Sequence, residues 1–181
     1  MADTRKFKAT DLFKFNNINL DPLTETFNIS FYLSYLNRWP SLCVAQESIA
    51  SESSSLMGYI IGKSEGKGTD WHTHVTAITV APSSRRLGLA KTMMDYLETV
   101  GDSEKAYFVD LFVRTSNALA INFYKGLGYS VYRRVIGYYS NPYGKDEDSF
   151  DMRKPLARDT KRQSVRENGE YCNCSPNDVV F

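Results

Sequence analysis

The sequence of 181 residues is poor in cysteine, in long apolar runs and in excess charge of either sign. No apolar run approaches the roughly 18 residues of a membrane-spanning helix, and the amino terminus lacks the apolar core of a secretory signal, so we expect neither. The 22 basic residues almost balance the 21 acidic ones, for a net charge of +1. This balance gives no indication of DNA or a membrane as a partner.

The three cysteines are Cys43, Cys172 and Cys174. Their odd number and their spacing do not suggest a disulfide framework, which is typical of a reducing compartment. We therefore predict a cytoplasmic protein. Cys172 and Cys174 could form half of a metal site, but the sequence offers no cluster of ligands to complete it, so we predict no metal.

The central part of the chain alternates between strand and helix patterns. An alternating, β-branched strand at 72–80 precedes an amphipathic helix at 87–100, a buried strand at 107–113, a helix at 117–127 and a strand at 130–136. This order predicts a mixed α/β or α+β domain.

Weaker signals flank this central part. They predict a strand at 6–8, a helix capped by Thr10, a helix around 31–36, strands at 42–46 and 56–62 joined by a loop at 48–55, and a last strand at 150–154. Beyond Leu156 the charge rises and periodicity disappears. We therefore predict one domain over residues 1–156 and a flexible tail over 157–181.

The segment VAPSSRRLGLA at 80–90 joins the strand at 72–80 to the following helix. A helix start presents backbone N–H groups and the positive end of the helix dipole. Gly88 would let a ligand approach the backbone, and Arg85 and Arg86 would supply charged donors for phosphate oxygens. The segment is therefore either a pyrophosphate cradle or an ordinary turn with solvated arginines.

The run RRLGLA at 85–90 resembles the R/Q-x-x-G-x-G/A coenzyme A motif of the GNAT acetyltransferases, and AINFYKGLGY at 120–129 resembles the end of their domains. The resemblance implies acetyl-CoA as cosubstrate and a central mixed, mostly antiparallel sheet of six to seven strands flanked by about four helices. The residues it implies for the cofactor are Ile78, Val80, Arg85, Arg86, Gly88, Leu89, Ala90, Asn117 and Tyr124.

A closer resemblance covers about residues 1–160. The run DLFKFNNINLDPLTET at 11–26 is similar to the first helix and loop of the catalytic subunits of NatB complexes, which acetylate amino termini that begin Met-Asp, Met-Glu, Met-Asn or Met-Gln. It implies a large helical-repeat auxiliary subunit, ribosomes and nascent polypeptide amino termini as partners. The sequence departs from the family at Phe27, where many relatives have Tyr, and in the loop 64–70.

The resemblance also implies a substrate site. His74, Thr76 and Tyr139 look like the family residues that contact the side chain of the substrate's second residue. Histidine and tyrosine can form hydrogen bonds with both a carboxylate and a carboxamide. For the first methionine, the candidate pocket residues are Leu23, Phe27 and Tyr138. Without the resemblance, His74 would be read as a strand histidine whose hydrogen bonds are satisfied.

The chemistry requires a neutral amine that attacks a thioester. A protein α-amine has a pKa of roughly 7.7–8.0, against about 10.4 for lysine, so weak general-base help suffices. His74 and Glu25, which we also place among the substrate contacts, are the candidate bases. Tyr124 is the candidate general acid for the departing thiolate. Without the resemblance, we would interpret it as a tyrosine that packs on an apolar helix face. Backbone N–H groups near residues 78–80 could polarise the carbonyl.

Two other classes of function remain open on the sequence. A GNAT enzyme for lysine, a polyamine or a small amine would share the cofactor motif but not the segment 11–26. A non-catalytic acetyl-CoA-binding subunit would be expected to lose the motif at 85–90 or Tyr124, and this chain keeps both.

Overall fold

The computed structural model describes residues 2–21, 24–49, 56–142 and 144–179, and every structural statement below refers to these ranges. The chain divides into two compact units. The amino-terminal unit comprises Met1–Lys63 and Val75–Val100, and the carboxy-terminal unit comprises Ser64–His74 and Gly101–Phe181.

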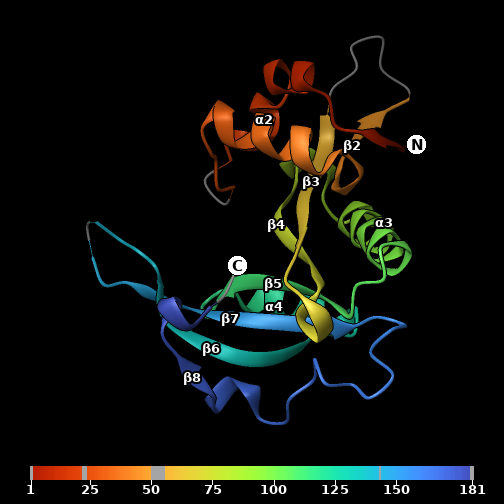
Figure 1. Cartoon of the computed structure of the whole chain (residues 1–181). Coiled ribbons are helices and arrows are strands. Elements are labelled where there is room, and N and C mark those ends of the chain that lie inside the picture. The colour runs from red at the N-terminus through yellow and green to blue at the C-terminus, as the bar shows by residue number, and fades with distance from the viewer. Residues whose placement is uncertain (1, 22–23, 50–55, 143, 180–181) are drawn as a thin grey trace. The chain divides into compact units, whose positions relative to one another are not determined.

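The amino-terminal unit is built on four strands in the order β1-β2-β3-β4 (Figure 1). Their bounds are Ala2–Lys6 for β1, Cys43–Ser48 for β2, Leu56–Glu65 for β3 and His72–Val80 for β4. The last residues of β3 and the first residues of β4 belong to the other unit. The pairs β1/β2 and β2/β3 are antiparallel. The predicted strand at 6–8 therefore lies earlier in the chain, at Ala2–Lys6.

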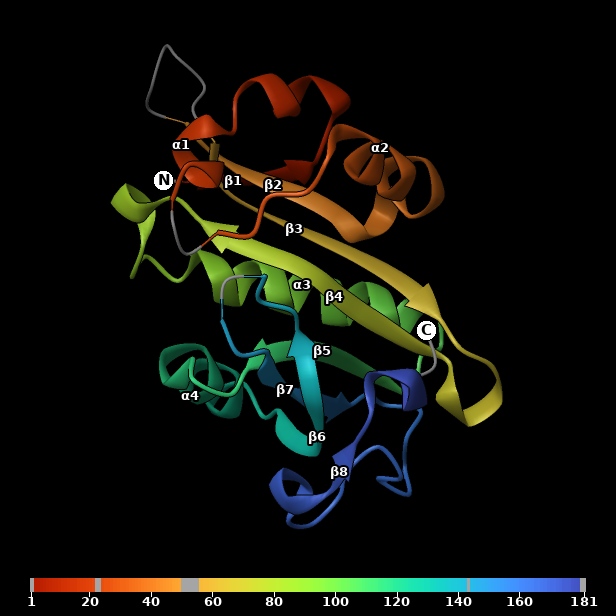
Figure 2. The same ribbon diagram turned by 90° about the vertical axis from the view of Figure 1, so that its left-hand side faces the viewer.

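Helices accompany these strands (Figure 2). They are a short 3₁₀ helix Ala9–Phe13, α1 Asn16–Asn19, α2 Ile29–Arg38 and α3 Leu89–Ser103. Thr10 does not cap an α-helix as predicted, because the chain forms the 3₁₀ helix there. Asn28 caps α2 by accepting a hydrogen bond from the Phe31 N–H, and Met93 of α3 packs against β3 at Gly58.

Aromatic side chains form the core of the amino-terminal unit. The buried ring of Tyr32 lies edge-on to Phe15 and Tyr59, with ring centroids 5.6 and 6.3 Å apart. Its hydroxyl lies 3.3 Å from that of Tyr59 and accepts a hydrogen bond from the Asn19 side chain at 3.2 Å. The first helical segments are therefore held on the sheet by burial of aromatic surface, with the polar ends of the rings paired.

The carboxy-terminal unit has four strands in the order β5-β7-β6-β8, which Figure 1 shows with β8 at the outer edge. The elements are β5 Phe108–Arg114, α4 Ala118–Gly126, β6 Ser130–Tyr139, β7 Glu147–Pro155 and β8 Asn173–Cys174. The pairs β5/β7 and β6/β7 are antiparallel, whereas β6/β8 is parallel. The mixed, mostly antiparallel character and the four α-helices agree with the expectation, but the described strands number eight rather than six to seven.

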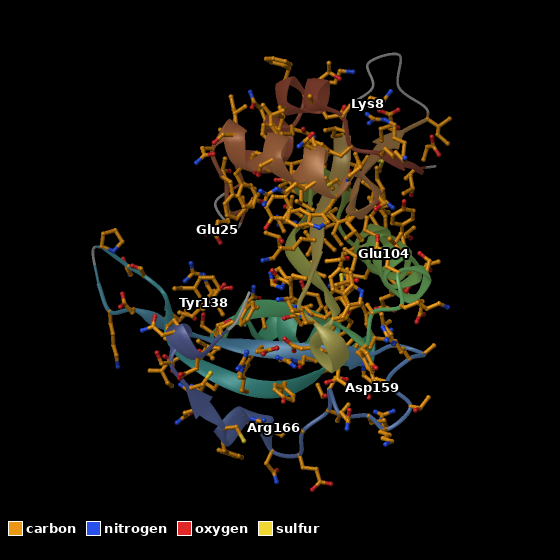
Figure 3. All side chains as sticks on the ribbon, viewed as in Figure 1. Lys8, Glu25, Glu104, Tyr138, Asp159 and Arg166 are labelled. Atoms are coloured by element: carbon orange, nitrogen blue, oxygen red, sulfur yellow. The ribbon has the colours of Figure 1, made fainter. Side chains whose placement is uncertain are left out.

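Residues 157–179, part of the segment predicted as a flexible tail, make backbone and side-chain contacts within the carboxy-terminal unit. The backbone of Gly169 packs so closely on β6 that a Cβ there would lie 2.0 Å from the Val131 carbonyl oxygen. Asp159 accepts three hydrogen bonds from Gln163 and Ser164, and Arg166 stacks on the Tyr132 ring; Figure 3 labels Asp159 and Arg166 on this segment. Such contacts depend on turns and single side chains, so they leave no periodic pattern in the sequence.

Candidate functional site

The turn between β4 and α3 has the backbone geometry of an anion-binding loop. Gly88 has a φ of 79°, which favours glycine, and a Cβ added there would meet no atom within 4 Å. Arg86 also has a positive φ, 67°, a conformation that costs a non-glycine residue on the order of 1 kcal/mol. Arg85, Arg86 and Gly88 are exposed, whereas Leu89 is buried. The exposed backbone and the start of the 15-residue helix α3 thus suit a phosphate group.

Arg85 forms an ion pair with Asp21 in the same unit. The Arg85 side chain is 41% exposed and that of Asp21 only 7%, so the Arg85 side chain remains partly accessible to solvent within the pair. Arg85 is therefore held in place by a carboxylate, and a phosphate would have to bind beside that contact.

The predicted residues of β4 in this unit, Thr76, Ile78 and Val80, are half-buried and alternate along the strand, so they share one face. The Thr76 hydroxyl donates a hydrogen bond to that of Tyr35 at 3.3 Å. Ala90 lies half-buried in the first turn of α3.

The loop before α2 lies against β4, because the hydroxyls of Thr24 and Thr79 are 2.8 Å apart. This loop carries the exposed Glu25, and Phe27 stacks on Phe31 with ring centroids 4.2 Å apart. Leu23, predicted for the methionine pocket, lies outside the described residues. The amino-terminal unit therefore contains both the turn that is predicted to bind the cofactor and the described candidate residues of this loop.

The carboxy-terminal unit gathers three predicted residues around Phe112. The centroid of the His74 ring lies 5.6 Å from that of the Phe112 ring. The Tyr138 ring stacks on the Phe112 ring, with centroids 4.8 Å apart. The Tyr139 hydroxyl donates to the Phe112 carbonyl at 3.1 Å, and Arg114 lies over the Tyr139 ring. Figure 3 labels Tyr138 near the end of β6.

Tyr124 and Asn117 belong to α4 and its start. Tyr124 is 8% exposed, and its burial together with nearby Tyr139 raises the pKa of its hydroxyl well above the ordinary value. The Asn117 side chain caps α4 by accepting a hydrogen bond from the Ala120 N–H at 3.1 Å. The oxygen of Asn117, a predicted cofactor residue, thus already stabilises the helix start.

A buried charge cluster lies beside His74. Nδ1 of His74 is 2.9 Å from Asp110 Oδ1, and Nε2 of His72 is 3.7 Å from the same oxygen. Burial alone would raise the pKa of Asp110, but the two neighbouring histidines and Arg153 hold it below its usual value. Burial opposes the charged form of His72, yet the carboxylates of Glu65 and Asp110 outweigh it and raise the pKa of His72.

A polar cavity of about 160 Å³ adjoins this cluster; its lining includes His72, Asp110, Arg133, Arg153 and Asp178. Among the described residues, no group of three or more His, Cys, Asp or Glu side chains is placed to hold a metal ion. Over the same ranges, no helix has the length and apolar character needed to cross a membrane.

Sequence reasoning about chemistry missed Asp110 and Phe112. The signal for Asp110 was available, because an acid in the middle of the apolar strand FVDLFVR must be paired when it is buried. The partners of that acid depend on the pairing of strands far apart in sequence, which no local pattern shows.

Comparison with known proteins gives concordant results. The pattern of the Acetyltransferase (GNAT) family matches residues 12–129. The chain is 82% identical, over the full length of both proteins, to the N-terminal acetyltransferase B complex catalytic subunit naa20 of Schizosaccharomyces pombe.

Two solved structures are similar as well. The protein of the same name from Chaetomium thermophilum, in complex with a bisubstrate analogue, is 44% identical over 97% of each chain, with a TM-score of 0.89. A NatB acetyltransferase complex bound to CoA and MES contains a chain that is 44% identical, with a TM-score of 0.75; the match covers 85% of this chain and 99% of that one.

Proposed function

The chain belongs to the acetyltransferase (GNAT) family and to its NatB catalytic subunits, and from this premise we propose that it acetylates protein amino termini that begin Met-Asp, Met-Glu, Met-Asn or Met-Gln. It is an acetyl-CoA-dependent N-terminal acetyltransferase. The observation that carries the proposal is the 82% identity with a NatB catalytic subunit along the entire chain. We assign the catalytic domain to residues 1–156.

The residues of the turn fit coenzyme A. Gly88 keeps the backbone accessible, Arg86 adopts the left-handed conformation that orients the loop, and α3 begins directly after it. The pyrophosphate would be bound by N–H groups of the helix start, with Arg85 and Arg86 as charged donors. Acetyl-CoA supplies a thioester whose carbonyl carbon is open to attack by an amine.

Side chains of this protein would then accept and donate protons during acetyl transfer. His74 is the candidate to accept a proton from the attacking amine, and the exposed Glu25 is the second candidate. Since the pKa of Tyr124 is raised, its hydroxyl stays protonated and acts by donating a hydrogen bond to the departing sulfur rather than by ionising. Thr76, Tyr138 and Tyr139 remain the candidates for contacts with the peptide.

The auxiliary subunit is proposed to cover the apolar surface of the amino-terminal unit. Phe13, the last residue of the 3₁₀ helix, is 86% exposed. Leu20, directly after α1, is 79% exposed, and Ile29, the first residue of α2, is 63% exposed. Large apolar side chains gathered on neighbouring segments are typical of a protein interface. We propose a large helical-repeat subunit there, in a cytoplasmic complex that acts on nascent chains at the ribosome.

The first experiment measures acetyl transfer to peptides that begin Met-Asp, Met-Leu or Ser-Glu and to an N-blocked lysine peptide, with and without the auxiliary subunit. We expect turnover of the Met-Asp peptide to dominate. Turnover of the lysine peptide alone would replace the proposal by another GNAT activity, and no turnover in the complex would favour a non-catalytic subunit.

Tyr124→Phe tests the chemistry of the site. Loss of a hydrogen bond made to the departing sulfur is expected to lower kcat by about 100-fold with little change in KM. Tyr129→Phe is the matched control, because Tyr129 is a buried tyrosine whose ring lies 5.9 Å from that of Tyr124. Equal kcat values for wild type and Tyr124→Phe would remove Tyr124 from the mechanism.

A further inference from the structure

Arg114, Tyr139 and Glu147 meet at one end of the sheet of the carboxy-terminal unit. Glu147, the first residue of β7, pairs with Tyr139 at the end of β6, and Arg114 is the last residue of β5, on the other side of β7. The Arg114 guanidinium lies 4.0 Å from the centroid of the Tyr139 ring, and its Nη1 lies 3.1 Å from Oε2 of Glu147. A positive charge is therefore held against the face of a tyrosine that is a candidate contact of the peptide.

The hydroxyl of Tyr139 already acts as a donor within the unit. It donates its hydrogen to the Phe112 carbonyl oxygen at 3.1 Å, and a phenol has one hydrogen to donate. In this arrangement the Tyr139 oxygen can accept a hydrogen bond from a carboxamide, but it has no hydrogen for a carboxylate. A substrate carboxylate beside Tyr139 therefore needs a donor or a positive charge from another side chain, and Arg114 lies over that ring.

The ion pair with Glu147 does not use up Arg114. The Arg114 side chain remains 44% exposed within the pair. Oε2 of Glu147 accepts from Arg114, whereas Oε1 accepts from the N–H and the hydroxyl of Ser116. These contacts, those of Ser116 foremost, lower the pKa of Glu147, so this side chain is ionised at neutral pH. Arg114 and Glu147 should therefore act in opposite directions on an acidic substrate.

We propose that Arg114 is a specificity-determining residue, whose positive charge favours substrates with an acidic second residue, Met-Asp or Met-Glu, over the uncharged amides Met-Asn and Met-Gln. This inference rests on the proposed function of the chain and on Tyr139 as a contact of the peptide. Asp and Asn have nearly the same shape, as do Glu and Gln, so charge is the main difference within each pair. A positive group beside the site stabilises the carboxylate and does little for the carboxamide.

The test compares two peptides that begin Met-Asp and Met-Asn and are otherwise identical, with the catalytic and auxiliary subunits together. The measured quantity is the ratio of kcat/KM for Met-Asp to that for Met-Asn. Arg114→Gln, which removes the charge, should lower this ratio about fivefold, whereas Arg114→Lys, which keeps the charge, should retain most of it. The wild-type ratio should also fall as the salt concentration rises, because salt screens a partly exposed charge.

Glu147→Gln separates an electrostatic role from a structural one. This variant breaks the same ion pair, keeps an oxygen for the Ser116 N–H and removes a negative charge, so the ratio should rise about twofold. If the ion pair had only a structural role, Glu147→Gln and Arg114→Gln would change the ratio in the same direction. Arg134→Gln is the matched control, because Arg134 is a 41% exposed arginine of β6 that pairs with Asp148; it should leave the ratio unchanged.

Three results would overturn the proposal. They are an unchanged ratio in Arg114→Gln, an equal fall in Arg114→Lys or in Arg134→Gln, and a fall rather than a rise in Glu147→Gln. If Arg114→Gln does not fold, the salt dependence of the wild type and the change in Glu147→Gln decide, and a ratio that responds to neither counts against the proposal. A failure of the proposed function would appear separately, as absence of wild-type turnover of both peptides.

Discussion

The two units bury different kinds of side chain. The interior of the amino-terminal unit combines aliphatic side chains with a group of packed aromatic rings that includes Phe15, Tyr32 and Tyr59. The amino-terminal unit also buries Asp11, but the described part of the carboxy-terminal unit buries a larger set of ionisable side chains, which includes Asp110 and Asp151. The first arrangement gains stability from apolar area, whereas the second depends on every charge keeping its partner.

This difference matches the tasks that we propose for the units. An aromatic unit with exposed apolar side chains suits a surface that a partner covers. A unit with buried charges suits control of protons, because interactions among charges are strong where water is excluded. The predictions below test this contrast.

The largest effect is expected from Asp151→Ala in the ionic interior. Asp151 is fully buried and accepts hydrogen bonds from Arg133 at 2.8 Å and from Arg153 at 3.0 Å. Its removal leaves buried positive charge without its partner, so the free energy of unfolding should fall by about 3–5 kcal/mol in urea titrations. The control Asp148→Ala, on the same strand but in a pair with the 41% exposed Arg134, should cost about 1 kcal/mol. Equal losses of unfolding free energy in Asp151→Ala and Asp148→Ala would show that the buried ion pairs contribute no more than the exposed one.

The next effect concerns binding. We expect the double substitution Phe13→Ser and Leu20→Ser to weaken binding of the auxiliary subunit by at least about 2 kcal/mol, roughly 30-fold, with little change in thermal stability. Calorimetric titration of the two subunits measures this. Leu119→Ser, at an 81% exposed leucine of α4, serves as the control and should bind normally. Unchanged affinity of the double variant would place the interface elsewhere.

A smaller effect is expected from Tyr32→Phe in the aromatic interior. The variant keeps the ring and loses the hydroxyl, which accepts hydrogen bonds from the Asn19 side chain and the Phe27 N–H. The cost should be about 1 kcal/mol in urea unfolding, because the apolar contacts persist. Tyr171→Phe, at a tyrosine 79% exposed, should have no measurable effect. A loss as large as that of Asp151→Ala would show that polar contacts govern this interior too.

The smallest effect is a pH dependence. The pKa of His72 is raised in the folded state, so its contribution to stability is complete below the ordinary value of about 6.5 and is lost as pH rises through the folded-state pKa. The difference in unfolding free energy between wild type and His72→Gln should therefore shrink as the pH rises from about 6.5 through the folded-state pKa. Tyr32→Phe should show a constant difference over this range. If the difference for His72→Gln grew with pH, the prediction that charged His72 stabilises the folded protein would be wrong.

Local patterns predicted much of this fold. The strand at 72–80 has the predicted bounds, and the helix predicted at 87–100 begins at Leu89, because Arg86 and Gly88 take positive φ values that a helix does not allow. The strand predicted at 130–136 extends to Tyr139. Periodicity captures such regular elements because each repeats its environment along the chain.

The site was predictable only in part. The turn at 85–90 carries a contiguous motif, and the resemblance supplied His74 and Tyr124, but the pairing of His74 with Asp110 joins residues 36 positions apart. Residues 157–179 form few regular elements, and their contacts with β6 come from single residues such as Gly169. Neither feature leaves a repeating signal in the sequence.

The parallel pairing of β8 with β6 has a consequence for solubility. A sheet edge without cover presents a row of N–H and C=O groups that can pair with another copy of the same strand. The short strand Asn173–Cys174 occupies that position next to Arg134 and Val135, and the Cys172 carbonyl accepts from the Arg134 N–H at 2.9 Å. A chain shortened to end before Gly169 would expose this edge, and we expect it to aggregate on warming, with light scattering that rises with concentration.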